Sequence, residues 1–301
     1  MKYPDDHQKY TDICAEGVKA EIRRLKIDNG ANLNCITFSP VTDNCKPPVV
    51  FVAGFASVIE NFTELIKALS QSCTVHYIET RDKYSSILSD NAGFTVRDVA
   101  SDISGAIDKL EVEAGRYILL TWSLGATASA ESFNSMDIKK PGLMVLAAPN
   151  GKFRIPLIGI IIARYLSWSY YLIRPLLKLY IKTFHVNTRE DYEMYNICVR
   201  ALDSADPRKM APTLLEMAKY EIWDSLEKID VPVIVIGASH DIFHYLGDAL
   251  EISSKISNAK YIDLGTNKRT HGPEVAEIIM NYPFSFLYFI LTGSALLTLF
   301  L

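Results

Sequence analysis

The sequence predicts an α/β protein with a mostly parallel sheet and an inserted run of helices. Short apolar runs alternate with amphipathic stretches from 47 to 150, the same alternation returns between 231 and 264, and strand signals stop in between. Repeated alternation of this kind favours a parallel sheet with helices on both faces. A chain of 301 residues is long enough for one large domain of this class with an insertion.

The expected elements follow in order along this alternation. An antiparallel hairpin leads in over 21–27 and 33–38, because Asp28-Asn29-Gly30 is typical of a tight turn between two such runs. Beyond the hairpin, apolar runs of strand length alternate with amphipathic runs of helix length. We expect strands at 49–53, 75–78, 117–121, 143–147, 231–237 and 260–264, and helices at 58–69, 95–110 and 125–133.

The interruption is predicted to be a helical cap. Long helical runs follow at 165–184 and 188–202, and the first part of the insertion is apolar and aromatic, punctuated by Lys and Arg. We therefore divide the chain into a discontinuous core at 1–150 and 226–282, a cap or lid at 151–225, and an apolar tail at 283–301.

Charge and cysteine content exclude several classes of protein. The chain has 31 Lys and Arg against 35 Asp and Glu, a net charge of −4, so no global positive field exists to hold nucleic acid. The five cysteines are scattered and form no close pair, which favours a reducing compartment. The first ten residues are polar and do not resemble a cleaved secretory signal. We expect a cytoplasmic protein that does not bind nucleic acid.

The tail at 283–301 contains no charged residue. As a helix it would span roughly 28 Å, about the hydrocarbon thickness of a bilayer. One interpretation is therefore membrane association through this segment. The alternative is a helix packed on the body or between protomers, because Gly293, Ser285, Ser294 and the threonines lower its hydrophobicity.

Ser123 is the candidate nucleophile. The segment Thr121-Trp122-Ser123-Leu124-Gly125 follows a buried strand run and precedes a small-residue helix, which is the context of a nucleophile elbow. Such a turn lifts the serine Oγ clear of the sheet and places the next N–H and the helix N-terminus beside a developing oxyanion.

A serine nucleophile needs a base and an acid that orients the base. His271 lies in a loop after the last expected strand, and Asp241 follows the strand at 231–237. The chain order Ser, Asp, His, with both later members just past strand ends, predicts a triad of Ser123, Asp241 and His271. A loop histidine and a helix-capping aspartate are the alternatives for the two partners.

Over about residues 45–282 the sequence resembles the α/β-hydrolase superfamily. The matching segments are Ala53-Gly54-Phe55-Ala56-Ser57, Ile78-Glu79-Thr80-Arg81-Asp82, Trp122-Ser123-Leu124-Gly125-Ala126, Ser239-His240-Asp241 and His271. The resemblance implies the α/β-hydrolase fold, with eight strands, a lid after the sixth strand, and an oxyanion hole formed by the N–H groups of Phe55 and Leu124. The chain departs from the family's pattern at Ala53, where many members carry His, and at Thr121 and Thr270, where Gly is usual.

These residues predict a serine hydrolase that cleaves a carboxylic ester or related acyl bond of an apolar or lipid-like small molecule. An acyltransferase would use the same triad, and a non-catalytic, membrane-associated binding protein would keep the fold and the pocket. No cofactor is required. His240 and His244 lie four residues apart, but the zinc-protease pattern needs Glu beside the first histidine and a continuous helix, so we expect no metal.

Overall fold

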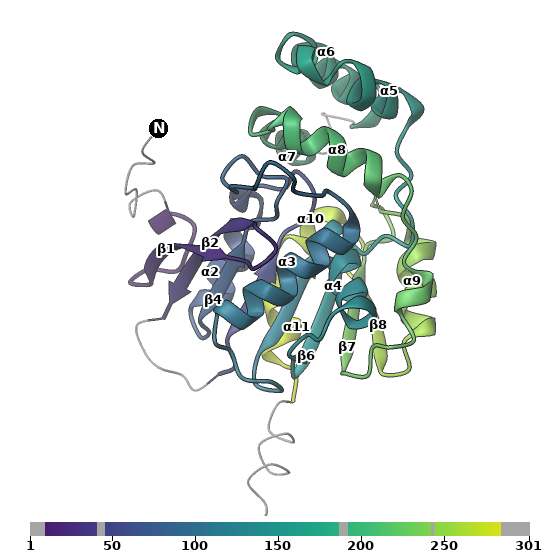
Figure 1. Cartoon of the computed structure of the whole chain (residues 1–301). Helices are drawn as coiled ribbons and strands as arrows, with labels where there is room; N and C mark the ends of the chain where they lie inside the picture. The colour runs from purple at the N-terminus through teal and green to yellow at the C-terminus, as the bar shows by residue number, and fades with distance from the viewer. Residues whose placement is uncertain (1–9, 41–45, 187–191, 242–243, 284–301) are drawn as a thin grey trace, which may run out of the picture.

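The computed structural model describes residues 10–40, 46–186, 192–241 and 244–283, and it contains an eight-stranded sheet (Figure 1). The strand order is β1-β2-β4-β3-β5-β6-β7-β8. The strands are β1 (Lys19–Lys26), β2 (Asn32–Ser39), β3 (Val49–Val52), β4 (Val75–Ile78), β5 (Ile118–Trp122), β6 (Leu143–Ala147), β7 (Val233–Gly237) and β8 (Ala259–Asp263).

The sheet is mostly parallel, as predicted. β1 and β2 form the expected antiparallel hairpin, and β2 also pairs antiparallel with β4. The six strands from β3 to β8 are parallel to one another. In the hairpin turn Gly30 has φ +87°, a left-handed conformation that glycine adopts without steric cost.

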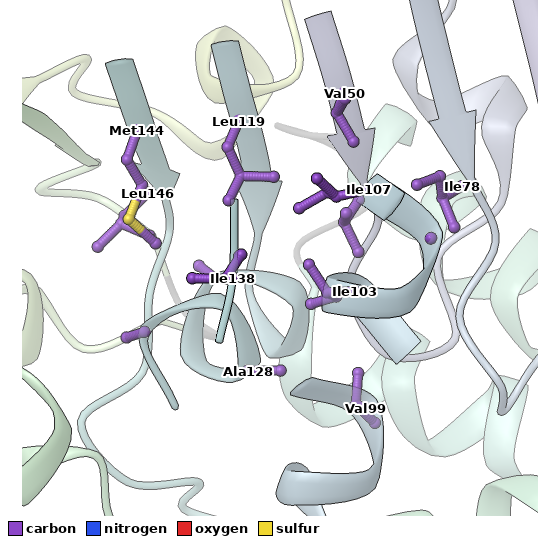
Figure 2. Close-up of a cluster of buried hydrophobic side chains, with 14 of the residues drawn as sticks. Val50, Ile78, Val99, Ile103, Ile107, Leu119, Ala128, Ile138, Met144 and Leu146 are labelled. Carbon is purple, nitrogen blue, oxygen red and sulfur yellow. The ribbon is translucent and has the colours of Figure 1, made fainter. Parts of the chain in front are cut away.

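Alternate side chains of the central strands are buried on opposite faces of the sheet. On one face Val50, Leu119 and Met144 pack against α3 (Val96–Lys109) and α4 (Leu124–Ser135), as Figure 2 shows. On the other face the strands pack against α2 (Thr63–Ser70) and α11 (Pro273–Met280). Strands covered on both faces read as continuous apolar runs, which explains why the sequence revealed them clearly.

The helix boundaries follow local capping chemistry. Thr95 accepts a hydrogen bond from the Asp98 backbone N–H, and the Asp98 carboxylate accepts one from the Thr95 N–H. This reciprocal arrangement starts α3 one residue after the predicted start of the helix. The remaining core helices are η1 (Ile59–Phe62), η4 (Trp223–Ser225), α9 (Leu246–Lys255) and α10 (Asn267–Thr270).

In the described part of the chain no strand is assigned between β6 and β7, and six helices precede η4 in this segment. They are α5 (Leu157–Tyr165), η2 (Ser167–Ser169), α6 (Tyr170–Tyr180), η3 (Ile181–His185), α7 (Tyr192–Asp203) and α8 (Pro207–Met217). Figure 1 shows them gathered at one end of the sheet, with α5 and α6 farther from it than α7 and α8. The predicted run at 165–184 is broken at Leu166, whose φ of −121° and ψ of 8° leave the helical region. The division into core and cap domains at 150 and 225 stays a prediction.

The predicted tail lies, from residue 284 on, outside the described residues. Within the described ranges, no helix is both long enough and apolar enough to cross a membrane.

Candidate active site

Ser123 lies at the sharp turn between β5 and α4. Its φ of 49° and ψ of −113° are unusual for a residue with a side chain, as a strained elbow requires. Two glycines allow the close packing around it: a Cβ on Gly54 would lie 2.9 Å from the Ser123 Cβ, and one on Gly125 would lie 2.7 Å from the Ala53 carbonyl oxygen. The fold therefore presents the Ser123 side chain at the end of the central strand.

Thr121, where the family's pattern has glycine, is accommodated before this turn with its hydroxyl paired. Its side chain is fully buried, and its hydroxyl donates to the carbonyl oxygen of Val145 in β6 at 3.1 Å. Because the hydroxyl has a partner, burying it carries no desolvation penalty that would distort the elbow.

A histidine joins Ser123 to Asp241, and it is His244. The His244 Nε2 is 3.1 Å from the Ser123 Oγ, and its Nδ1 is 2.8 Å from the Asp241 Oδ2. The Asp241 Oδ1 also accepts the His244 backbone N–H at 3.2 Å. A carboxylate accepts hydrogen bonds only, so Nδ1 carries the proton and Nε2 is left to accept from the serine hydroxyl. This is the chain of contacts that activates a serine.

His271, the predicted base, has different partners. Its Nδ1 donates to the carbonyl oxygen of Asn267 at 2.9 Å, and its ring stacks on Phe62 and lies 4.0 Å, centroid to centroid, from the Trp122 ring. Among the described residues no hydrogen bond joins it to Ser123 or Asp241. Burial lowers the pKa of His271 to about 4. The structure thus differs from the sequence-based expectation at the base. Both histidines line the cavity, but His244 is the one that contacts Ser123 and Asp241.

Two asparagines also belong to this cluster. Asn267, at the start of α10, donates from Nδ2 to the Asp241 Oδ2 at 2.6 Å and so fixes the carboxylate that holds His244. Asn150, just past β6, donates to the Ser123 Oγ at 3.3 Å. Neither was identified from the sequence, because an asparagine after a strand has no pattern that separates it from a turn residue.

His244 did carry a usable signal. It follows Asp241 by three residues just beyond a buried strand, a spacing at which an aspartate side chain can accept the N–H of a turn. Sequence reasoning considered His244 only together with His240, as a possible zinc pair, and set that interpretation aside without testing His244 as the base. In the described ranges no group of three or more His, Cys, Asp or Glu side chains could hold a metal ion.

The loop after β3 carries the predicted oxyanion donor Phe55, and two residues after β4 hold this loop in place. The Asp82 carboxylate accepts the Ala56 N–H at 3.0 Å. The Lys83 ammonium donates to the Gly54 carbonyl oxygen at 2.7 Å and to Asp82 at 3.2 Å. Burial lowers the pKa of Lys83, and the neighbouring Asp82 carboxylate opposes this shift.

Leu124, the second predicted donor, is the first residue of α4. An N–H at this position has no carbonyl acceptor within its own helix, and the positive end of the helix dipole lies there. Leu124 follows Ser123 directly in the chain, and Phe55 follows Gly54, which packs against the Ser123 Cβ. The role of their two N–H groups as an oxyanion hole stays a prediction.

A cavity of about 530 Å³ opens above Ser123 and extends between the helices of the cap. Its polar end contains Ser123, Asn150, His244, Asn267 and His271. Its other walls are mostly apolar and include Ile155, Ile162, Tyr170, Leu177, Met194, Ile197, Met210 and Leu214. This volume lies in the range of small-molecule sites, and a mostly apolar wall with a few converging polar groups is typical of them.

Asp248, the other acid near the β7 exit, has a separate role. Its carboxylate forms a bidentate pair with Arg154 at 2.7 and 2.8 Å and accepts the Gly151 N–H at 2.9 Å. It therefore anchors the start of the cap segment to α9, away from the Ser123 cluster.

Comparisons with known proteins agree on the fold. No protein-family model and no curated protein sequence matches the chain. Solved structures do match: an enol-lactonase from Burkholderia xenovorans LB400 (15% identity, 88% of this chain and 100% of that chain, TM-score 0.68) and a thermophilic esterase from Thermogutta terrifontis (15%, 89% and 98%, 0.67). A bromoperoxidase from Bacillus anthracis is similar as well (17%, 90% and 99%, 0.66).

The order of the strands, the elbow at the end of β5 and these likenesses define one class. The chain has the α/β-hydrolase fold, as the sequence predicted. At identities of 15–17%, the structural likeness establishes the fold alone, and the chemistry has to be argued from the site itself.

Proposed function

We propose that this protein is a serine hydrolase that cleaves a carboxylic ester, or a related acyl bond, of an apolar small molecule. The observation that carries the proposal is the unbroken chain of contacts from Asp241 through His244 to Ser123, at the floor of an apolar cavity. The names of similar structures, an enol-lactonase and an esterase among them, support acyl chemistry on this fold.

In the proposed mechanism the Ser123 Oγ attacks the acyl carbonyl carbon while His244 Nε2 takes the hydroxyl proton. Asp241 holds the imidazole in the productive tautomer and stabilises the imidazolium that forms. The carbonyl oxygen becomes an oxyanion, which the N–H groups of Phe55 and Leu124 stabilise. Collapse of this intermediate transfers the proton from His244 to the leaving alcohol. Water then repeats the sequence on the acyl-enzyme and releases the acid.

The base in this proposal is His244, and His271, the base that the sequence predicts, serves as a neutral wall of the site. A base must accept a proton in the transition state, and the imidazolium of His244 would have the Asp241 carboxylate 2.8 Å away. The Nδ1 of His271 meets only a neutral carbonyl group, and the low pKa of His271 disfavours its charged form.

The cavity supports an apolar acyl or alkyl group as the part of the substrate that is bound. Its walls above the polar end are supplied by aliphatic, methionine and aromatic side chains from α5 to α8. Burial of apolar area against such a wall contributes roughly 25 cal/mol per Å². We therefore expect hydrolysis of p-nitrophenyl esters to improve as the acyl chain lengthens from acetate, until the cavity is filled.

Replacing the nucleophile tests the proposal most simply. In a Ser123→Ala protein we expect ester turnover to fall by about 10⁵ or more and covalent labelling by a fluorophosphonate probe to disappear. A Ser239→Ala protein is the matched control, because Ser239 is exposed, follows β7 and lies outside the cavity. Labelling that persists in Ser123→Ala would refute the assignment, and so would a wild-type protein that neither labels nor turns over any ester.

The cytoplasmic location and the membrane association of residues 283–301 stay predictions from the sequence. The proposed chemistry does not depend on either of them.

A further inference from the structure

The cap exposes a concentrated apolar surface on its outer helices. Of the 17 large apolar side chains exposed in the described part of the chain, 12 lie between residues 157 and 184, so this surface is not scattered over the molecule. Figure 1 shows α5 and α6 on the side of the cap that is farther from the sheet. We call the outer cap face the set Leu157, Tyr165, Trp168, Leu172, Leu176 and Phe184, whose exposed fractions run from 64% to 79%.

The outer cap face is distinct from the substrate cavity. The residues of the same helices that line the cavity include Ile162 of α5 and Tyr170 and Leu177 of α6, and none of the six residues of the outer cap face does so. Each helix is thus apolar on both sides. An apolar helix face that contacts neither the core nor a bound substrate marks a site for a partner, because exposed apolar patches of this kind are rare on monomeric proteins.

The chain segment that carries this face has charged residues of one sign. Residues 151–186 contain six Lys or Arg and no Asp or Glu. Arg174 and Lys178 pair with Asp203 of α7. Arg164 and Lys182 are exposed, and no carboxylate of the described residues pairs with them. The same segment therefore combines exposed Trp, Tyr, Phe and Leu side chains with two exposed cations, Arg164 next to Tyr165 and Lys182 two residues before Phe184.

We propose that the outer cap face docks on a lipid bilayer that carries anionic headgroups. Leu and Phe side chains would enter the acyl boundary, Trp168 and Tyr165 would lie at the headgroup level, and Arg164 and Lys182 would reach the lipid phosphates. Charge complementarity favours this partner over a second copy of the chain, because two identical faces would bring the same cations together. Docking needs no membrane-spanning helix.

Trp168 provides a direct probe of this contact. The chain has three tryptophans, and Trp122 and Trp223 are buried or partly buried, whereas Trp168 is 79% exposed. Addition of phosphatidylcholine vesicles containing phosphatidylserine should shift the fluorescence emission of the full-length protein to shorter wavelength. A Trp168→Phe protein should still bind these vesicles but lose the shift. Residues 284–301 contain no tryptophan, so binding through the tail alone would leave the emission unchanged.

Two matched pairs of variants separate the apolar and the charged contributions. A Leu172→Ser/Leu176→Ser protein should bind the anionic vesicles about tenfold more weakly, whereas an Ile87→Ser/Leu250→Ser protein, altered at exposed apolar residues outside the cap, should bind like wild type. An Arg164→Gln/Lys182→Gln protein should also lose about tenfold, and a Lys19→Gln/Lys26→Gln protein on β1 should lose far less. The charge effect should shrink at high salt.

These measurements do not require catalysis and can be made with Ser123→Ala protein, so their outcome is independent of the proposed hydrolysis. A vesicle-induced shift of Trp168 emission that the Leu172→Ser/Leu176→Ser change weakens supports the proposal. Unchanged Trp168 emission overturns it, and vesicle binding without a shift would assign the binding to another segment. A vesicle-independent dimer that the same leucine changes dissociate would overturn it in favour of a second copy of the chain.

Discussion

The loops that follow β7 and β8 each bring a histidine to the same cavity, and the two histidines have opposite surroundings. His244, after β7, lies between a carboxylate and the serine hydroxyl. His271, after β8, is enclosed by the rings of Phe62 and Trp122, and its Nδ1 donates to a neutral carbonyl group. A histidine serves as a base when its charged form has a partner. The Asp241 carboxylate therefore decides which of the two histidines has a partner for its charged form. The position of a histidine after the last strand does not decide this.

Removing the Asp241 carboxylate should cause the largest loss of ester turnover among the changes that test this difference. An Asp241→Asn protein should lose about 10⁴ in ester turnover, because the amide favours the wrong tautomer of His244 and does not stabilise its imidazolium. Steady-state kinetics on a short soluble ester measures the loss. Asp248→Asn is the control: it weakens the ion pair with Arg154 and should lower thermal stability while turnover changes little. The reverse ranking would show that Asp248 orients the base.

The pH dependence of the free energy of unfolding tests whether His271 is buried as a neutral imidazole. Its pKa is lowered from 6.5 to about 4 by burial, so the unfolded state binds a proton more readily than the folded state between these values. The stability is therefore complete above about pH 6.5 and falls as the pH drops towards 4, by up to about 3 kcal/mol.

Urea unfolding at several pH values should show that a His271→Asn protein lacks this part of the slope. His76, whose pKa burial also lowers to about 4, contributes in both proteins and does not blur the difference. An identical slope in the variant would mean that His271 titrates normally and is not enclosed as the structure has it.

A smaller effect is expected from the loop after β3, which leaves both histidines in place. In a Lys83→Met protein the Gly54 carbonyl oxygen loses its ammonium donor, so the Phe55 N–H should be less well positioned. We expect kcat to fall about tenfold with KM and the pH profile of kcat nearly unchanged, since the base is not altered. A shifted pH profile would show instead that Lys83 acts through the charge of the histidine cluster. Lys140→Met is the control for the loss of one positive charge, because Lys140 is exposed and does not line the cavity.

Much of this architecture could be predicted from the sequence because it rests on local patterns. The runs at 49–53 and 143–147 are buried on both faces and are therefore continuously apolar. The turn at Asp28-Asn29-Gly30 contains the Asn-Gly pair that is typical of tight hairpin turns. Ser123 was identifiable for the same reason, since a strand, a turn and a small-residue helix follow one another directly.

The base could not be chosen in this way, because His244 and His271 both follow a strand and both line the cavity. Their difference lies in side-chain contacts between distant segments: Phe62 and Trp122 against His271, and Asn267 against Asp241. The departure at Thr121 has a similar explanation, because its acceptor, the Val145 carbonyl oxygen, belongs to another strand. Contacts of this kind have no signature in a single sequence.

The central claim is that His244, and not His271, activates Ser123, and the rate of fluorophosphonate labelling in matched variants tests it most directly. Asparagine at either position keeps a donor near the former Nδ1 and removes the Nε2 that would accept the proton. The account predicts that His244→Asn slows labelling about 10³-fold, and that His271→Asn stays within about tenfold of wild type. Labelling that is lost in His271→Asn and kept in His244→Asn would contradict it.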